Sequence, residues 1–197
     1  MEKKPLIKRM RIIVIGGSSG SLDVLLVLLP LLNKKFSIPI LLVLHRGQAA
    51  DTGLVELLQS KSSLRIKEVD EKDRLAPGWL YLAPPDYHVL LETDGTLSLD
   101  ASEKVHYSRP SIEVSFTSAS AAYGDALVAI LFSGANADGA QAMRVVKEHG
   151  GMNIVQDPKE AAVNFMPEQA ILHAPVDYVL PAKDIATLLN RLSDGMG

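Results

Sequence analysis

Three residues far apart along the chain, Ser18, His45 and Asp138, have the side chains of a nucleophile, a base and an orienting acid. A serine hydroxyl becomes an effective nucleophile when a neutral imidazole takes its proton, and a carboxylate beside that imidazole fixes its tautomer and stabilises the imidazolium that forms. Such a trio attacks the carbonyl of an ester or an amide, and water then releases the acyl group. The residue types therefore predict a hydrolase that cleaves a side-chain ester or amide.

Ser18 lies in a glycine-rich turn between an apolar run and a leucine-rich segment. Residues 16–20, Gly-Gly-Ser-Ser-Gly, fit the pattern G-x-S-x-G, in which flanking glycines let the chain turn sharply and present the serine hydroxyl. Backbone N–H groups of this turn, at Gly17 and Ser19, would face a developing oxyanion together with the positive end of the following helix. The pattern alone also fits an ordinary strand-to-helix turn, so the serine needs partners elsewhere in the chain.

A nucleotide-binding turn is the alternative that the glycines raise. The dinucleotide-binding fingerprint requires a glycine two positions after Gly16, where this chain has Ser18, and no lysine follows as a phosphate-binding P-loop requires. Both nucleotide motifs therefore fail. A nucleotide-binding protein is supported by the glycine-rich turn alone.

His45 and Asp138 each follow an apolar run of strand length. His45 comes directly after 40–44, and Asp138 lies in the loop that follows 126–132. Because the carboxyl ends of parallel strands meet at one edge of a sheet, both side chains can reach Ser18. Asp138 also precedes a helical segment, so its spacing fits an N-cap as well as an acid. The remaining histidines fit solvent-exposed or helix-capping positions: His88, His106, His149 and His173.

The elements that would position these residues alternate between strands and helices. Apolar runs without polar alternation, typical of strands buried on both faces, recur along the chain: 12–15, 40–44, 126–132, 154–155 and 178–180. Segments with helical periodicity lie between most of them: 22–33, 52–60, 111–123, 139–149 and 183–192. This alternation predicts an α/β fold with a doubly wound, mostly parallel sheet. We expect a single domain over 12–193, between a basic tail at 1–11 and a short tail at 194–197.

One stretch departs from this alternation and predicts a β-hairpin added to the sheet. Short extended runs at 79–83, 89–92 and 97–99 are separated by Pro84-Pro85 and by Asp94-Gly95. The last two runs fit the strands of a hairpin that closes on a primed turn at Asp94-Gly95.

Composition excludes several classes of protein. The chain has 197 residues, of which 47% are hydrophobic, and it contains no cysteine, so disulfides, thiolate catalysis and cysteine-based zinc sites are excluded. Acidic and basic residues are interspersed and the formal charge is -3, which gives no strong field to attract nucleic acid or an anionic membrane. The apolar run after the basic N-terminus is too short for a signal peptide or a membrane span. We therefore expect a cytoplasmic protein that neither binds nucleic acid nor inserts into a membrane.

The same residues resemble motifs of the catalytic domain of the bacterial chemotaxis protein-glutamate methylesterases, and the resemblance extends from 12 to 192. Residues 15–20, Ile-Gly-Gly-Ser-Ser-Gly, resemble the family's IGASTGG and place its nucleophile on Ser18. Leu44-His45 resembles its QH motif, which places the base on His45. Residues 132–139, Phe-Ser-Gly-Ala-Asn-Ala-Asp-Gly, resemble LTGMGxDG, which places the acid on Asp138. Further matches lie elsewhere in the chain: 81–84, 109–114, 156–157 and 166–167.

The resemblance implies a function as well as a fold. It implies a doubly wound α/β sheet with an added hairpin, and hydrolysis of glutamate γ-methyl esters on the cytoplasmic helices of chemoreceptors with release of methanol. Deamidation of receptor glutamine is the companion activity. No cofactor and no metal are implied, and the partner is the methylated cytoplasmic domain of a chemoreceptor. Many members also have an N-terminal receiver domain, for which this chain has no room, so we expect any regulator to be a separate protein that acts in trans.

The chain departs from the family's pattern beside the acid. Ala135 and Asn136 stand where LTGMG has methionine and glycine, and we expect both to shape the pocket that holds the substrate carbonyl. Arg109 is a candidate substrate contact at the carboxyl ends of the strands, and an ordinary surface arginine fits its position as well. These departures keep one alternative open, a module with the same fold that binds receptor helices without hydrolysing their esters.

Overall fold

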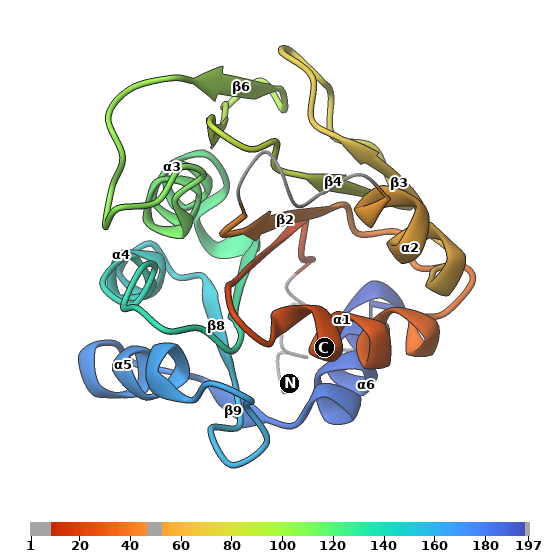
Figure 1. The fold of residues 1–197 in the computed structure, drawn as a ribbon. Helices are drawn as coiled ribbons and strands as arrows, with labels where there is room; N and C mark the ends of the chain where they lie inside the picture. The colour runs from red at the N-terminus through yellow and green to blue at the C-terminus, as the bar shows by residue number, and fades with distance from the viewer. Residues whose placement is uncertain (1–8, 47–52, 196–197) are drawn as a thin grey trace, which may run out of the picture.

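The computed structural model describes residues 9–46 and 53–195, which form one parallel sheet of seven strands with helices on both faces (Figure 1). The strand order is β3-β4-β2-β1-β7-β8-β9, and every neighbouring pair is parallel. The strands are β1 (Ile12–Gly17), β2 (Ile40–Leu44), β3 (Arg65–Glu68), β4 (Trp79–Leu82), β7 (Leu127–Leu131), β8 (Met152–Gln156) and β9 (Tyr178–Leu180). The predicted α/β fold with a doubly wound sheet is confirmed.

The helices divide into two layers, with α1, α2 and α6 on one face of the sheet and α3, α4 and α5 on the other (Figure 1). Their bounds are α1 (Ser21–Leu28), α2 (Leu54–Lys61), α3 (Ile112–Tyr123), α4 (Ala142–Glu148), α5 (Phe165–His173) and α6 (Ala182–Ser193). Short 3-10 turns follow α1 at Leu29–Leu31 and α3 at Gly124–Ala126. Among the residues that the structure describes, no helix is long and apolar enough to cross a membrane.

The central strand β1 belongs to both hydrophobic cores. Ile13 and Ile15 pack with the layer of α1, α2 and α6, whereas Ile12 and Val14 pack with the layer of α3, α4 and α5. All four side chains are fully buried. A strand that is covered on both faces needs apolar residues at every position, which is why the sequence shows an unbroken apolar run.

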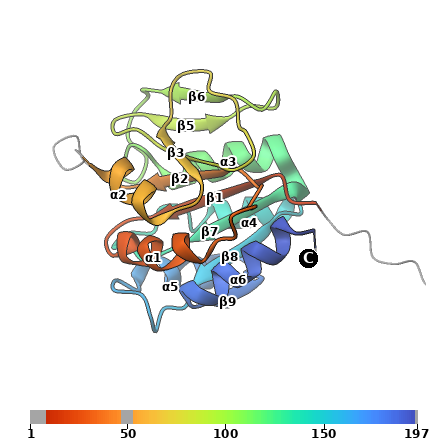
Figure 2. The same ribbon diagram turned by 90° about the vertical axis from the view of Figure 1, so that its right-hand side faces the viewer.

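The added hairpin is a separate antiparallel pair, β5 (His88–Leu91) and β6 (Leu97–Asp100). It packs against α3 through β5 (Figure 2). The predicted hairpin is therefore present, but its predicted primed turn is wrong. The N–H of Gly95 donates to the carbonyl of Glu92 at 3.0 Å, and a positive φ occurs only at Gly95 (+82°) and not at Thr93 or Asp94. This pattern is that of an ordinary turn followed by a glycine bulge, the usual three-residue hairpin loop.

Some elements were not predicted from the sequence. β3 is an edge strand with charged residues such as Arg65 and Glu68, so its apolar signal is weak. The run at 79–83 was predicted as extended, and it forms β4, which pairs with β2 inside the main sheet. α5 was missed, and the predicted helix over 22–33 ends early, at Leu28, because Pro30 leads the chain into a 3-10 turn.

The sheet order brings the ends of β2, β1 and β7 side by side. Gly17 pairs with Leu44 on one side, and Gly16 pairs with Leu131 on the other. The connection from β1 leads to β2 on one side, whereas the connection from β7 leads to β8 on the other side. The boundary between β1 and β7 is therefore the topological switch point, where α/β proteins bind ligands. Ser18 and His45 follow directly on β1 and β2, and the loop after β7 contains Asp138.

We predict that Gly16 is required for α3 to pack onto β1. A Cβ atom at this position would lie 2.3 Å from Cγ2 of Ile112, the first residue of α3. The substitution Gly16→Ala should therefore lower the free energy of unfolding by about 2 kcal/mol through overpacking. In an Ile112→Ala background the clashing atoms are absent, so the same substitution should cost at least about 1 kcal/mol less. Urea unfolding of the four proteins measures both costs, and simple additivity would contradict the prediction.

Candidate active site

The turn that contains Ser18 is hydrogen-bonded to Ser133 in the loop after β7. The Ser18 N–H donates to the Ser133 carbonyl at 2.9 Å, and the Ser21 hydroxyl donates to the same oxygen at 2.8 Å. The Ser133 hydroxyl in turn donates to the carbonyl of Ser19 at 2.7 Å. Ser133 is fully buried, and its own N–H donates to Oε1 of Gln156 at the end of β8 at 2.9 Å. The loop after β7 thus holds the Ser18 turn through hydrogen bonds of Ser133, and the end of β8 holds Ser133 in turn.

Glycine is needed where this loop approaches the serine. A Cβ atom on Gly134 would lie 3.1 Å from Cβ of Ser18 and 2.5 Å from Cε of Met166. Gly20, at the start of α1, has a φ of +83°, a conformation that residues with a side chain rarely adopt. The loop and the turn therefore lie close enough to form one surface around Ser18.

His45 lies next to this turn and contacts Asp138. Its backbone N–H donates to the carbonyl of Gly17 at 3.1 Å, which continues the pairing of β2 with β1 by one residue. Its Nε2 atom lies 2.6 Å from Oδ2 of Asp138, and the His45 side chain is 10% exposed while that of Asp138 is fully buried. With Nε2 engaged by the carboxylate, Nδ1 is the ring nitrogen that remains for Ser18.

The carboxylate of Asp138 is surrounded by donors from the beginning of α3. Its Oδ1 accepts hydrogen bonds from the Ser111 hydroxyl at 2.9 Å and from the Glu113 N–H at 3.0 Å. Its Oδ2 accepts the Ile112 N–H at 2.7 Å in addition to the contact with His45. Asp138 therefore caps the N-terminus of α3 from a distant part of the sequence, where the helix dipole also favours a negative charge.

These contacts keep Asp138 ionised despite its burial. Burial alone would raise the pKa of the carboxyl group, but the hydrogen bond with His45 and those from the Glu113 and Ile112 N–H groups lower it further than burial raises it. The net effect is a pKa below the ordinary value. A buried anion fixed in this way can hold the His45 ring and stabilise its protonated form.

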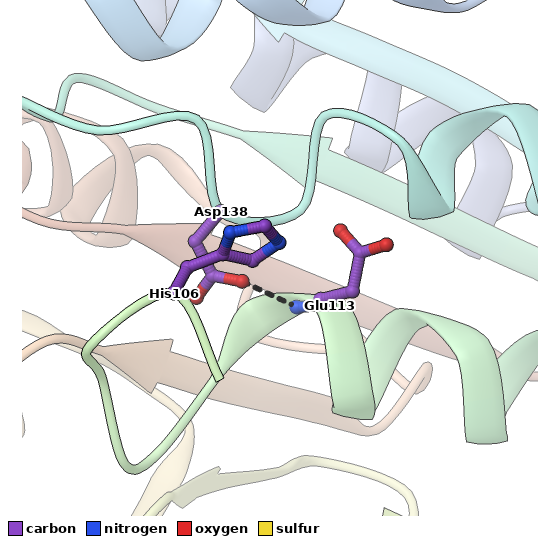
Figure 3. Close-up of side chains that lie close together, drawn as sticks. All are labelled: His106, Glu113 and Asp138. Carbon is purple, nitrogen blue, oxygen red and sulfur yellow. Dashed lines mark hydrogen bonds between the residues drawn. The ribbon is translucent and has the colours of Figure 1, made fainter. Parts of the chain in front are cut away.

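Two further titratable side chains, His106 and Glu113, lie beside Asp138 (Figure 3). Burial raises the pKa of Glu113, and the negative charge of Asp138 raises it further. The three side chains could each offer a ligand atom to a metal, since these atoms lie within 4.8 Å of one another. Both oxygens of Asp138 already accept hydrogen bonds, however, so a cation would have to displace His45 or the N–H groups of α3. We therefore interpret this group as the electrostatic surroundings of Asp138.

The backbone N–H groups that are available to bind an oxyanion differ in part from those predicted, at Gly17 and Ser19. The N–H of Ser18 is already used by Ser133. Within residues 9–46 and 53–195, the N–H groups of Ser19, Gly20 and Ala135 make no hydrogen bond, so they are free to bind an oxyanion. The predicted contribution of Ser19 is consistent with this geometry, whereas Gly17 contributes the carbonyl that holds His45.

The remaining predicted site residues, Asn136, Ala135 and Arg109, lie around the loop before Asp138 and in a cavity beside His45. Oδ1 of Asn136 accepts the Asp138 N–H at 3.1 Å and shapes the loop before the acid. Ala135 is exposed on the same loop. One terminal nitrogen of Arg109 donates to the carbonyls of Ala101 and Ser102 at 2.7 and 2.6 Å, and its side chain lines a cavity that His45 also lines. In the described part of the chain, the Ser18 hydroxyl makes no hydrogen bond, and such contacts often tighten only when substrate binds.

Sequence reasoning missed the residues that fix the acid and the turn. Ser111 and the N–H groups of Ile112 and Glu113 lie about 25 residues from Asp138 along the chain. Ser133 acts mainly through its backbone, which no residue pattern reveals. The sequence signal for these donors was a short motif that leads into α3, Arg-Pro-Ser-Ile-Glu at 109–113.

Comparisons with known proteins agree on one family. The family model described as CheB methylesterase matches residues 13–189. A protein of Leptospira interrogans, provisionally named protein-glutamate methylesterase/protein-glutamine glutaminase, is 44% identical over 180 residues, which are 91% of this chain and 93% of that protein. The protein-glutamate methylesterase/protein-glutamine glutaminase of Nitrosospira multiformis is 35% identical, over 96% of this chain and 54% of that protein. This chain therefore spans about half the length of the Nitrosospira protein.

A solved structure gives the same result for the fold. The crystal structure of the Thermotoga maritima CheB methylesterase catalytic domain matches with a TM-score of 0.88 and 33% sequence identity, over 93% of this chain and 98% of that chain. The fold and the site define a doubly wound α/β protein in which a serine, a histidine and an aspartate follow the ends of three adjacent strands. More particularly, the chain belongs to the CheB methylesterase family.

We predict that Asp138→Asn lowers stability in a pH-dependent way. The variant keeps the size of the side chain but loses the charge that four donors bind, so we expect a loss of about 2 to 4 kcal/mol at pH 7. Because the pKa of Asp138 is lowered in the folded protein, its stabilising effect is present above the unfolded pKa, about 3.9, and is lost as the pH falls through the folded pKa.

Urea unfolding of both proteins between pH 7 and pH 3 measures this difference. The gap between wild type and variant should narrow below about pH 4. A gap that stays constant or widens toward acid pH would show that the charge of Asp138 does not stabilise the fold.

Proposed function

We propose that this protein is a cytoplasmic protein-glutamate methylesterase that hydrolyses glutamate γ-methyl esters in the cytoplasmic domain of a chemoreceptor and releases methanol. The observation that carries the proposal is the 2.6 Å contact between His45 and a buried, ionised Asp138, at the end of the strand beside the Ser18 turn. The names of the related proteins support the same substrate chemistry. We also propose that glutamine side chains of the receptor are deamidated at this site.

The first half of the reaction transfers the acyl group to Ser18. Nδ1 of His45 takes the proton of the Ser18 hydroxyl while Oγ attacks the ester carbonyl. Asp138 stabilises the imidazolium that forms, and the free N–H groups of Ser19 and Gly20 bind the oxyanion. Collapse of this intermediate breaks the bond to the methoxy group, which leaves as methanol with the proton from His45.

The second half returns the enzyme to its starting state. His45, again neutral, takes a proton from water, and the hydroxide attacks the acyl-enzyme carbonyl. The bond to Ser18 Oγ then breaks, Ser18 recovers the proton from His45, and the glutamic acid side chain that is released gives its proton to water and becomes a carboxylate. With glutamine as substrate the same steps release ammonia in place of methanol.

A binding module with the same fold is the second candidate function, and Ala135 and Asn136 favour it. These two residues replace the methionine and glycine of the family motif beside Asp138. In either case the partner is the methylated receptor domain, and we infer that any regulator acts as a separate protein. The two candidates differ in one respect, since a binding module would leave the ester intact.

We predict that Ser18→Ala abolishes methanol release from a methylated receptor fragment. Removal of a triad serine lowers turnover by up to about a millionfold. The measurement is the methanol and, with a glutamine-bearing fragment, the ammonia released per enzyme. Ser60→Ala is a matched control, because Ser60 is exposed on α2 and, among the residues that the structure describes, its hydroxyl donates only to the Leu57 carbonyl.

Two outcomes would contradict the proposal. Full activity of Ser18→Ala would exclude Ser18 as the nucleophile. Tight binding of the methylated fragment by the wild-type protein without any methanol or ammonia would favour the binding module.

A further inference from the structure

A cavity of about 320 Å³ is lined in part by His45. It is lined by the segment that precedes α3, which contributes Lys104, Tyr107 and Arg109, and by Arg46 and Asp86. Three of these side chains are cationic and one is anionic, whereas the whole chain carries a formal charge of -3. The cavity is therefore positive within a protein that is negative overall.

Lys104 and Arg109 are the cations whose charge is available to a ligand. Arg46 already pairs with Glu68 at 2.7 Å. The hydrogen bonds of Arg109 go to the neutral carbonyls of Ala101 and Ser102, which fix the guanidinium without cancelling its charge. Within the described residues, Lys104 forms no ion pair. A carboxylate in the cavity would meet two cations that form no ion pair with the described residues, although the charge of Arg109 also acts on Asp100.

A strained turn holds this segment at the edge of the site. Val105 and Ser108 exchange backbone hydrogen bonds of 3.1 and 2.9 Å, and the two residues between them, His106 and Tyr107, have φ values of +49° and +63°. Left-handed backbone costs about 1 kcal/mol or more for each residue other than glycine, and it is concentrated at functional sites. The Tyr107 side chain is 97% exposed, so the turn presents an aromatic ring to solvent at the rim of the cavity.

We propose that Lys104, Tyr107 and Arg109 form a specificity subsite that binds an acidic side chain flanking the ester of the protein substrate. The inference rests on the proposed function, and it adds the requirement for a negative charge next to the reacting glutamate. Lys104 and Arg109 bind the carboxylate, and the Tyr107 ring covers the aliphatic part of the same segment. The net negative charge of the enzyme would repel an acidic substrate, so these local cations decide which segment enters.

The test compares two peptides of equal length that each carry one glutamate γ-methyl ester. The residues on both sides of the ester are Glu in one peptide and Met in the other, because a Gln control would itself be a substrate for the proposed deamidation. For the wild-type protein, we expect kcat/KM for methanol release to be about tenfold higher with the Glu-flanked peptide. The ratio should fall as the salt concentration rises, because salt screens exposed charges.

Charge reversal tests the subsite directly. Lys104→Glu should reduce the ratio to about one or invert it. Lys34→Glu is the matched control, because Lys34 is also exposed and changes the net charge equally, but lies before the amino end of β2. The control should keep the wild-type ratio. A ratio of one for the wild-type protein, or an equal loss in both variants, would overturn the subsite.

A measurement of peptide binding distinguishes failure of the proposed function from failure of the subsite. If the wild-type protein cleaves neither peptide, the methylesterase proposal is wrong, and fluorescence anisotropy with labelled peptides still decides the subsite. The Ser18→Ala protein should bind the Glu-flanked peptide more tightly than the Met-flanked peptide, and adding Lys104→Glu should remove this preference. Equal binding of both peptides by Ser18→Ala would overturn it.

Discussion

The carboxylate of Asp138 is the group on which the site depends. A buried carboxylate is costly unless hydrogen bonds replace its water, and here the Ser111 hydroxyl, two N–H groups of α3 and His45 do so. The same contacts fix where α3 begins and engage Nε2 of His45, which leaves Nδ1 as the ring nitrogen for Ser18 in the proposed mechanism. Asp138 is thus both a helix cap and the proposed acid. The sequence predicted a cap for the helix that follows Asp138, but α4 begins after Gln141 without a side-chain cap, and Asp138 caps α3 instead.

The rest of the site follows from close packing around the switch point. β1 lies between β2 and β7, so Ser18 and His45 are neighbours as soon as the strands pair. Gly16 lets α3 approach β1, and Gly134 lets the loop after β7 approach Ser18. Because each approach needs the absence of a side chain, the serine turn, the acid loop and α3 are fixed relative to one another.

The sequence predicted much of this arrangement because its strongest signals are local. Buried strands such as 12–15 and 40–44 are unbroken apolar runs, and the side chains that follow them must lie at one edge of a parallel sheet. Charged edge strand β3 and the bulged loop at Gly95 were misjudged, since packing and backbone conformation decide them. The donors that hold Asp138 could not be predicted, because Ile112 and Glu113 act through backbone N–H groups from a distant segment. The catalytic roles of Ser18, His45 and Asp138 remain predictions that only chemistry can test.

The most direct test of the account is labelling of the protein by a serine-directed fluorophosphonate, followed by mass spectrometry. The account predicts a single modified residue, Ser18, because this serine directly follows Gly17, whose carbonyl binds the His45 N–H, and Nε2 of His45 contacts the buried carboxylate of Asp138. His45→Ala and Asp138→Asn should slow the labelling by about a hundredfold or more, since general base catalysis contributes 10² to 10⁴. Labelling at another residue, or an unchanged rate in both variants, would contradict the claim that Asp138 and His45 activate Ser18.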